Sequence, residues 1–97
     1  MVQRGEYRCR RARRTDIPAV AQVERAVFPH EPYPRKVFEN FVCVFPDLFF
    51  VATSGRRIVG YIMGAVDSKG SGWVLSIAVH PCHRGKGLGS RLLGKLL

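Results

Sequence analysis

The feature that most constrains the fold is a glycine-rich turn that joins an apolar strand to an amphipathic helix. Residues 76–80 read Ser-Ile-Ala-Val-His, and residues 84–90 read Arg-Gly-Lys-Gly-Leu-Gly-Ser. Leu88, Leu92 and Leu96 then recur at helical spacing, which predicts a helix that begins at the glycines. The first N–H groups of a helix have no partner within it and carry the positive end of its dipole. The turn is therefore predicted to bind phosphate.

The spacing within this turn separates it from the two better-known phosphate-binding turns. It has no Gly-Lys-Ser/Thr ending, and no acidic residue follows that could hold a ribose. It reads Arg84-x-x-Gly87-x-Gly89 and follows Ala-Val-His-Pro at 78–81. This combination resembles the cofactor-binding motif of the GNAT superfamily of N-acetyltransferases, whose signature is Arg or Gln, two residues, Gly, one residue, then Gly or Ala. The resemblance is to the branch that acetylates protein N-termini, including the ribosomal-protein alanine type.

The hydrophobic pattern along the rest of the chain predicts the order β-α-α-β-β-β-α. This order indicates an α+β (mixed α/β) domain with a mainly antiparallel sheet, and it is similar to the first part of the GNAT fold. Residues 1–6 are expected to form a loose terminus. The predicted elements are a strand at 7–12, a helix from 15–16 to 27, a helix over 37–45, strands at 48–53, 58–66 and 73–79, and the helix that follows the glycines.

Three local details accompany this prediction. Thr15-Asp16 is expected to supply the N-cap of the first helix. Gly60 and Gly64 are expected to permit close approach by a neighbouring segment. Alternating apolar residues should lie on one face of the strand at 73–79, namely Trp73, Leu75, Ile77 and Val79.

The chain of 97 residues is interpreted as a single domain spanning 1–97. The resemblance implies that this domain is incomplete at its C-terminus, because the family continues with a fifth strand, a fourth helix and a closing hairpin. The strand at 73–79 would then be an open, apolar sheet edge. Such an edge favours self-association, so a homodimer or a higher oligomer is expected.

The resemblance implies acetyl-CoA as the cofactor. In the family the pantetheine arm pairs with the fourth strand, and the matching residues are Ile77, Ala78 and Val79. The pyrophosphate lies on backbone N–H groups, and the matching residues are Arg84, Gly85, Lys86, Gly87, Leu88, Gly89 and Ser90. A side chain at position 87 or 89 should clash with the phosphate or with the helix packing. A bulge in the fourth strand is expected to leave an N–H near Val79 free to bind the acetyl oxygen.

The loop at 28–34, Phe-Pro-His-Glu-Pro-Tyr-Pro, resembles the acceptor loop of the N-terminal acetyltransferase branch. A peptide or protein N-terminus is therefore the expected acceptor. Phe28 and Tyr33 are candidates for its pocket, with core packing as the alternative. The candidate general bases are Glu31 and Glu24, with a surface charge and a solvated helix residue as the respective alternatives. The family's general acid lies in a region beyond this sequence, so no residue is assigned that role.

The net charge of +9 arises from 16 Lys and Arg against 7 Asp and Glu, and it attracts polyanions. Coenzyme A, nucleic acid, ribosomes and acidic peptides are all compatible with it. Two interpretations of the arginine-rich N-terminal segment stay open: a solvated edge strand, or contact with the ribosome or a nucleic acid. The arginines concerned are Arg4, Arg8, Arg10, Arg11, Arg13 and Arg14.

The remaining motifs exclude other classes of protein. Cysteines at 9, 43 and 82 are odd in number and far apart, so no disulfide framework is implied. His80-x-Cys82-His83 lacks a second ligand pair, and no metal is expected. No apolar run approaches the ~20 residues that span a bilayer, which favours a cytoplasmic protein. The alternatives to a protein N-terminal acetyltransferase are a small-amine acetyltransferase and a non-catalytic acetyl-CoA-binding or structural fragment.

Overall fold

A computed structural model describes residues 7–97; the terminus at 1–6, Arg4 included, lies outside the described residues. Four antiparallel strands form one sheet in the order β1-β2-β3-β4. The predicted element order β-α-α-β-β-β-α is confirmed. The strands are β1 (Tyr7–Arg11), β2 (Phe49–Ser54), β3 (Arg57–Val66) and β4 (Gly72–Val79), and the helices are α1 (Ile17–Val27), α2 (Arg35–Val44) and α3 (Leu88–Leu96).

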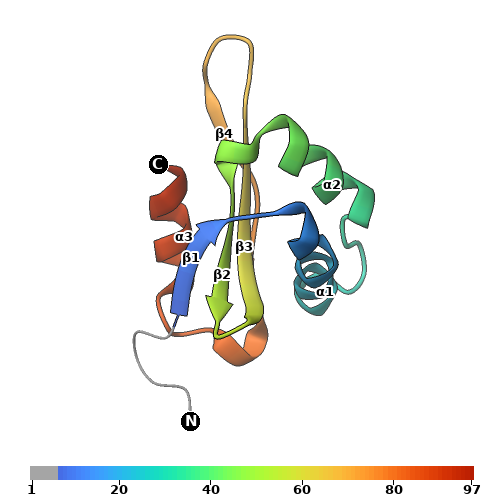
Figure 1. Cartoon of the computed structure of the whole chain (residues 1–97), viewed down its shortest axis with the longest axis vertical. Helices are drawn as coiled ribbons and strands as arrows, with labels where there is room; N and C mark the ends of the chain where they lie inside the picture. Colours follow the sequence, from blue (N-terminus) through green and yellow to red (C-terminus); the bar gives the residue numbers. More distant parts are fainter. Residues whose placement is uncertain (1–6) are drawn as a thin grey trace.

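Helices cover both faces of the sheet (Figure 1). Helices α1 and α2 lie on one face and α3 lies on the other, so successive residues of β2 and β3 are buried in two separate clusters. This explains why the sequence of these strands is continuously apolar and does not alternate. The first cluster contains Val20, Phe38, Phe49, Val51, Tyr61 and Met63, among others. The second contains Phe50, Ala52, Val59, Ile62, Leu88 and Leu92.

The predicted close approaches at two glycines of β3 are confirmed. A Cβ atom built on Gly60 would lie 3.0 Å from the carbonyl oxygen of Ala78 in β4. One built on Gly64 would lie 2.9 Å from a methyl group of Leu96 in α3 and 3.0 Å from the carbonyl oxygen of Trp73. Both positions therefore let β4 and α3 pack more closely than any larger residue would permit.

The N-cap expected from Thr15-Asp16 is only partly correct. Asp16 occupies the N-cap position of α1, but its side chain makes no cap hydrogen bond to that helix. Its carboxylate instead accepts two hydrogen bonds from the Arg10 guanidinium, at 2.7 and 3.0 Å, and one from the Arg13 N–H at 2.8 Å. A charged partner on the neighbouring strand thus competes successfully with the free N–H groups of the helix.

The prediction that the alternating apolar residues of β4 lie on one face is wrong, because the strand contains a bulge. Met63 pairs with Ser76 whereas Gly64 pairs with Val74, so Leu75 is an extra residue in β4. An extra residue reverses the alternation of side chains along the strand. Trp73 therefore does not share the face of Ile77. The bulge also lies at Leu75, well before the position near Val79 where it was expected.

Strand β4 is at the end of the strand order, so no strand of the described residues pairs with its outer side. Several of its large apolar side chains are exposed, Trp73 most of all at 61%. The hairpin that joins β3 to β4 projects beyond the rest of the domain (Figure 1). Within the described part of the chain, no helix is long and apolar enough to span a bilayer.

Candidate cofactor and acceptor site

The glycine turn lies between the end of β4 and the start of α3, after a short 3₁₀ turn at Pro81–His83. Gly85 and Gly87 have φ values of +78° and +75°, a backbone conformation that residues with a Cβ rarely adopt. Among the described residues, no acceptor is found for the N–H groups of Leu88, Gly89 and Ser90. The turn therefore presents donors and a positive dipole end to an anion, as the sequence predicts.

Apolar packing and hydrogen bonds hold the turn in place. Leu88 and Leu92 are buried against the sheet. The Arg84 Nε donates to the carbonyl oxygen of Val79 at 3.2 Å, and the Tyr7 hydroxyl lies 2.8 Å from the His83 Nδ1. These contacts join the turn to β4 and to β1.

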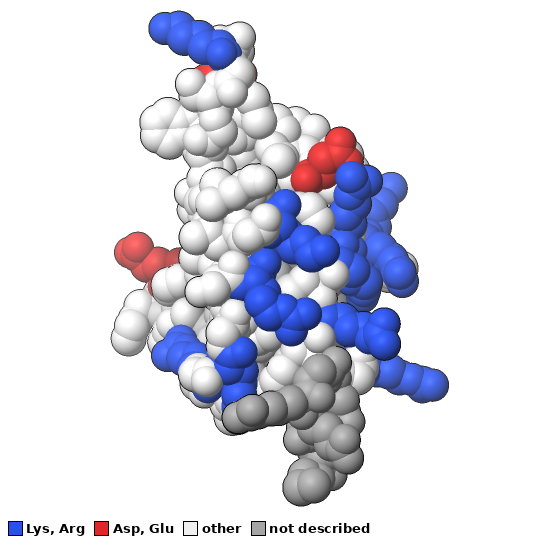
Figure 2. Space-filling model, turned by 90° about the vertical axis from the view of Figure 1, so that its left-hand side faces the viewer, with Lys and Arg blue, Asp and Glu red and all other residues white. Residues whose placement is uncertain are grey.

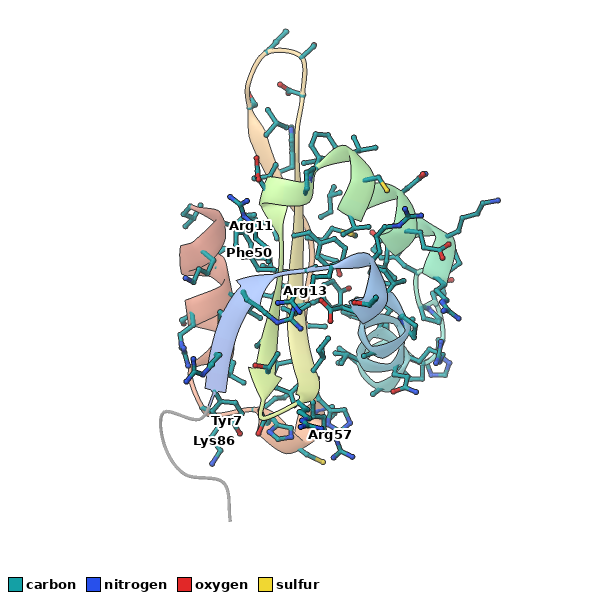
Figure 3. The ribbon with its side chains drawn as sticks, in the orientation of Figure 1. Tyr7, Arg11, Arg13, Phe50, Arg57 and Lys86 are labelled. Atoms are coloured by element: carbon teal, nitrogen blue, oxygen red, sulfur yellow. The ribbon has the colours of Figure 1, made fainter. Side chains whose placement is uncertain are left out.

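Basic side chains surround this end of the molecule. Lys86 and Arg57 lie at the same end of the sheet as Tyr7, the lower end in Figure 3. Burial lowers the pKa of His83, and electrostatic repulsion from neighbouring groups, including Arg57 and Lys86, lowers it further. A neutral His83 ring is therefore favoured near neutral pH, and the positive charge near the turn comes from Arg and Lys side chains.

The expectation that side chains at positions 87 and 89 would clash with the helix packing is wrong. A Cβ atom at Gly87 or at Gly89 would meet nothing within 4 Å. Gly87 is required by its positive φ, whereas Gly89 lies in α3 with no such restriction. Gly89 is therefore a position where the shape of the turn can be changed without straining the fold.

The predicted pantetheine strand forms the open edge beside this turn. Ala78 is buried in the cluster beneath α1, whereas Ile77 and Val79 point to the α3 face, opposite Ile62 and Gly60. The outer side of β4 is unpaired in the described chain. An extended ligand can therefore lie along it as an additional strand would.

One interpretation of the sequence, that Glu24 is a solvated helix residue, is wrong. Its side chain is 2% exposed, and its carboxylate accepts hydrogen bonds from the Tyr61 hydroxyl and from the Tyr33 N–H, the latter at 2.9 Å. Tyr33 belongs to the loop at 28–34. The buried carboxylate therefore fastens this loop to the centre of the sheet.

Tyr61 and Ser76 extend this contact to β4, and neither residue was a candidate from the sequence. The Tyr61 oxygen lies 2.7 Å from the Ser76 Oγ. Because the single Tyr61 proton is donated to Glu24, the Ser76 hydroxyl must donate to Tyr61. Burial and the Glu24 carboxylate raise the pKa of Tyr61, so it stays protonated. The sequence signal that could have identified Tyr61 is a tyrosine inside an apolar strand, because its buried hydroxyl needs a hydrogen-bond partner.

The other candidates of the loop are exposed. Phe28 and Tyr33 are 41% and 42% exposed, so neither is a buried core residue, although the Tyr33 ring packs edge-to-face on Phe38. Glu31 is exposed and takes part in no hydrogen bond or ion pair described for residues 7–97. The structure therefore brings Glu24, Tyr33 and Ser76 together, and it leaves Phe28 and Glu31 outside that network.

Comparison with known proteins extends these observations. The profile of the acetyltransferase (GNAT) family matches residues 12–97. An uncharacterized N-acetyltransferase of Methanocaldococcus jannaschii is 41% identical over 81 residues, which are 84% of this chain and 51% of that protein. An N-alpha-acetyltransferase of Sulfurisphaera tokodaii is 35% identical over 99 residues, covering 91% of this chain and 59% of that protein.

The same similarity is found among solved structures. Ard1 from Thermoplasma volcanium superposes with a TM-score of 0.85 at 25% sequence identity, and the match covers 94% of this chain and 61% of that chain. The chain thus spans between 51% and 61% of the length of these relatives. The strand, glycine turn and helix lie within the matched range. The chain belongs to the acetyltransferase (GNAT) family.

Proposed function

We propose that the chain carries the cofactor-binding half of an acetyl-CoA-dependent N-acetyltransferase that acts on protein N-terminal α-amines in the cytoplasm. The observation that carries this proposal is the position of the open glycine turn beside the unpaired edge of β4. Ser76 on that strand is connected through Tyr61 and Glu24 to the loop at 28–34. The N-terminal acceptor is supported by relatives named N-alpha-acetyltransferase. It is also supported by the Phe-Pro-His-Glu-Pro-Tyr-Pro loop itself.

In this proposal the turn holds the pyrophosphate of acetyl-CoA. The N–H groups of Leu88, Gly89 and Ser90 are the donors, and Arg84 and Lys86 add positive charge. The pantetheine arm lies along Ile77–Val79. When bound, the cofactor supplies a thioester whose acetyl group is transferred.

Two glutamate substitutions within α3 test the cofactor site. A glutamate at position 89 would bring a negative charge to the donors, so Gly89→Glu is expected to weaken acetyl-CoA binding by at least tenfold. Gly94→Glu is the matched control, because Gly94 lies in the same helix and its Cβ would also meet nothing within 4 Å. Calorimetric titration measures both. Equal affinities in the two variants, or no binding by the parent chain, would contradict the proposed site.

The roles of the two glutamates follow from their surroundings. Glu31 is exposed on the loop and is proposed as the general base, which takes a proton from the attacking amine directly or through one water. The amine nitrogen forms a bond to the acetyl carbon, the carbon–sulfur bond breaks, and the thiolate takes a proton from solvent. Glu24 is proposed as a positioning residue, because its carboxylate is occupied by Tyr33 and Tyr61.

The same network places polar groups beside the bulge in β4. Ser76 directly follows Leu75, the extra residue whose backbone groups are left out of regular pairing. A free backbone donor aimed at a developing oxyanion contributes a few kcal/mol to transition-state stabilisation. We infer that the acetyl group lies near residues 75 and 76.

Kinetics on the two glutamates separates their roles. Glu31→Gln should lower kcat by roughly 10²–10⁴, with little change in the peptide KM. Glu24→Ala should raise the peptide KM, and Glu24→Gln should restore part of the loss because it keeps an acceptor oxygen. A loss of kcat at unchanged KM in Glu24→Ala would refute the positioning role.

The acceptor class is tested with three substrates at equal concentration. A peptide with a free α-amine should be acetylated, whereas the same peptide with a blocked N-terminus and an internal lysine should not. A small diamine should also be a poor substrate. Acetylation of the diamine alone would select a small-amine acetyltransferase, and acetyl-CoA binding without turnover on any amine would select a non-catalytic binding module.

A further inference from the structure

A strongly basic groove runs between β1, the β2–β3 turn and α3, at the edge of the sheet opposite to β4. It has a volume of about 530 Å³, and Cys9, Thr53 and Gly55 line it together with five basic residues. The basic residues are Arg8, Arg10, Arg56, Arg91 and Lys95. In Figure 2, which views the molecule from the side of α3 and β1, Lys and Arg side chains gather over the middle and the right-hand side of this face. One acidic group lies beside them, and another lies at the left-hand margin.

Most of this charge is not neutralised within the described chain. Arg10 is paired with Asp16. Arg8, Arg56, Arg91 and Lys95 are exposed and form no ion pair with any described carboxylate. No Asp or Glu is among the residues that line the groove. Four like charges close together are unfavourable in the free protein, so an anionic partner would relieve their repulsion.

The positive charges come from different elements around the groove. Arg91 and Lys95 are four residues apart and lie on the same side of α3, with a rise of ~6 Å between them. On β1, Cys9 packs in the cluster beneath α3, so Arg8 and Arg10 leave this edge strand on its other face. Charges that are spread over a helix and an edge strand suit a chain of phosphates better than a single phosphate group.

The residues favour a nucleic acid over an acidic peptide. Four of the five basic side chains are arginines, whose planar guanidinium groups bind phosphate oxygens in pairs. No aromatic or large aliphatic residue lines the groove, so it offers neither a pocket for a peptide side chain nor a stacking platform for unpaired bases. Recognition would be through the backbone of a double helix.

We propose that this groove binds the phosphodiester backbone of double-helical RNA. The choice of RNA rests on the proposed function, since RNA helices are the nucleic acid near nascent protein N-termini. The groove lies at the β1 edge of the sheet, and β2 and β3 separate that edge from β4. The chain can therefore hold RNA while the candidate acetyl-transfer site stays accessible.

Salt-dependent binding to a short RNA duplex tests the proposal. In the groove variant Arg56→Gln, Arg91→Gln, Lys95→Gln, the slope of log Kobs against log salt should be shallower by roughly 2 to 3, because each phosphate contact contributes about 0.9. The control variant Arg25→Gln, Lys36→Gln, Lys69→Gln has the same net charge and changes only exposed residues outside the groove. It should bind RNA like the parent chain.

Three results would overturn the proposal. Equal losses of RNA affinity in the two variants would mean that binding depends on net charge and not on the groove. Tighter binding of an acidic polypeptide than of the RNA duplex would assign the groove to acidic proteins, and tighter binding of a DNA duplex of the same sequence would assign it to DNA. The assay contains no acetyl-CoA, and the acetylation assays contain no RNA, so either proposal can fail while the other stands.

Discussion

At the scale of single residues, two buried carboxylates set much of the local structure. Asp16 and Glu24 are 8% and 2% exposed, and each carboxylate accepts hydrogen bonds from two other residues. Burial of a charge is costly unless hydrogen bonds replace the lost hydration. Each carboxylate therefore joins the segments that supply its donors: Asp16 joins β1 to the start of α1, and Glu24 joins the loop at 28–34 to β3.

Asp16→Ala should lower the free energy of unfolding by about 1–3 kcal/mol, because it leaves Arg10 and the Arg13 N–H without their acceptor. Burial alone would raise the pKa of Asp16, but the hydrogen bonds from Arg10 and Arg13 outweigh it and hold the pKa below its ordinary 3.8. The stabilisation is thus complete above pH ~4 and is lost as the pH falls through the lowered pKa.

Denaturant unfolding of parent and variant across this pH range measures the effect. Asp47→Ala is the matched control, because the Asp47–Arg11 ion pair is at 3.0 Å but its side chains are 72% and 66% exposed. It should change the stability by less than about 0.5 kcal/mol. A constant difference between Asp16→Ala and the parent down to the lowest pH would argue against the ion pair as the cause.

Gly60→Ala tests the close contact between β3 and β4. The new Cβ would lie 3.0 Å from the Ala78 carbonyl oxygen, which is backbone and cannot rotate away, so we expect a loss of about 1–3 kcal/mol. Gly72→Ala is the control, since its Cβ would meet nothing within 4 Å. Thermal unfolding compares the two, and equal midpoints would show that β4 can move away without cost.

At the scale of elements, two sets of groups in α3 have different roles. Its first turn supplies the free N–H groups of the candidate phosphate site, and its buried side chains, Leu88 and Leu92, pack on the sheet. The free N–H groups are stable there because the turn is open to solvent. Packing and binding can therefore be changed independently within one helix.

Gly94→Ala should stabilise α3. Gly94 lies in the helix, is exposed, and has open space around its missing Cβ, so alanine adds helix propensity without a clash. The expected gain is about 0.5–1 kcal/mol, measured by denaturant unfolding. Acetyl-CoA affinity should not change, and a weaker affinity would mean that the ligand reaches the second half of the helix.

At the scale of the whole molecule, the two edges of the sheet differ in character. Neither outer edge is paired with another strand of the described residues. The β1 edge adjoins the basic groove, whereas the β4 edge carries exposed apolar side chains, including Trp73, Val74 and Leu75. Unpaired apolar edges promote association with another strand. The two edges are thus suited to different partners.

We expect the chain to self-associate through residues 73–75 of β4, outside the segment proposed for the pantetheine arm, and Val74→Lys to reduce that association. A lysine on an edge strand opposes pairing with a second copy, and Val74 is 44% exposed, so the fold should tolerate it. Val44→Lys, at an exposed position of α2, is the control. Sedimentation should show a concentration-dependent dimer for the parent and the control. A monomeric parent would contradict the expectation.

Several features of this molecule follow from short sequence patterns. The glycine turn depends on backbone conformation and on the free groups at a helix start, which neighbouring residues determine. The element order follows from apolar spacing, and the close approaches at Gly60 and Gly64 from the lack of a side chain. The excess of basic residues is a matter of composition. These properties were therefore predictable from the sequence by itself.

Features that need partners far apart in the chain depend on how the whole chain folds. Tyr61, the partner of Glu24, is 37 residues away, and its contact with Ser76 spans a further 15. The bulge at Leu75 depends on how β4 pairs with β3, and the groove depends on α3 packing beside β1. From the local sequence, a carboxylate on a helix is interpreted as solvated and scattered arginines as a diffuse charge. Neighbouring residues do not indicate which distant segments come into contact when the core forms.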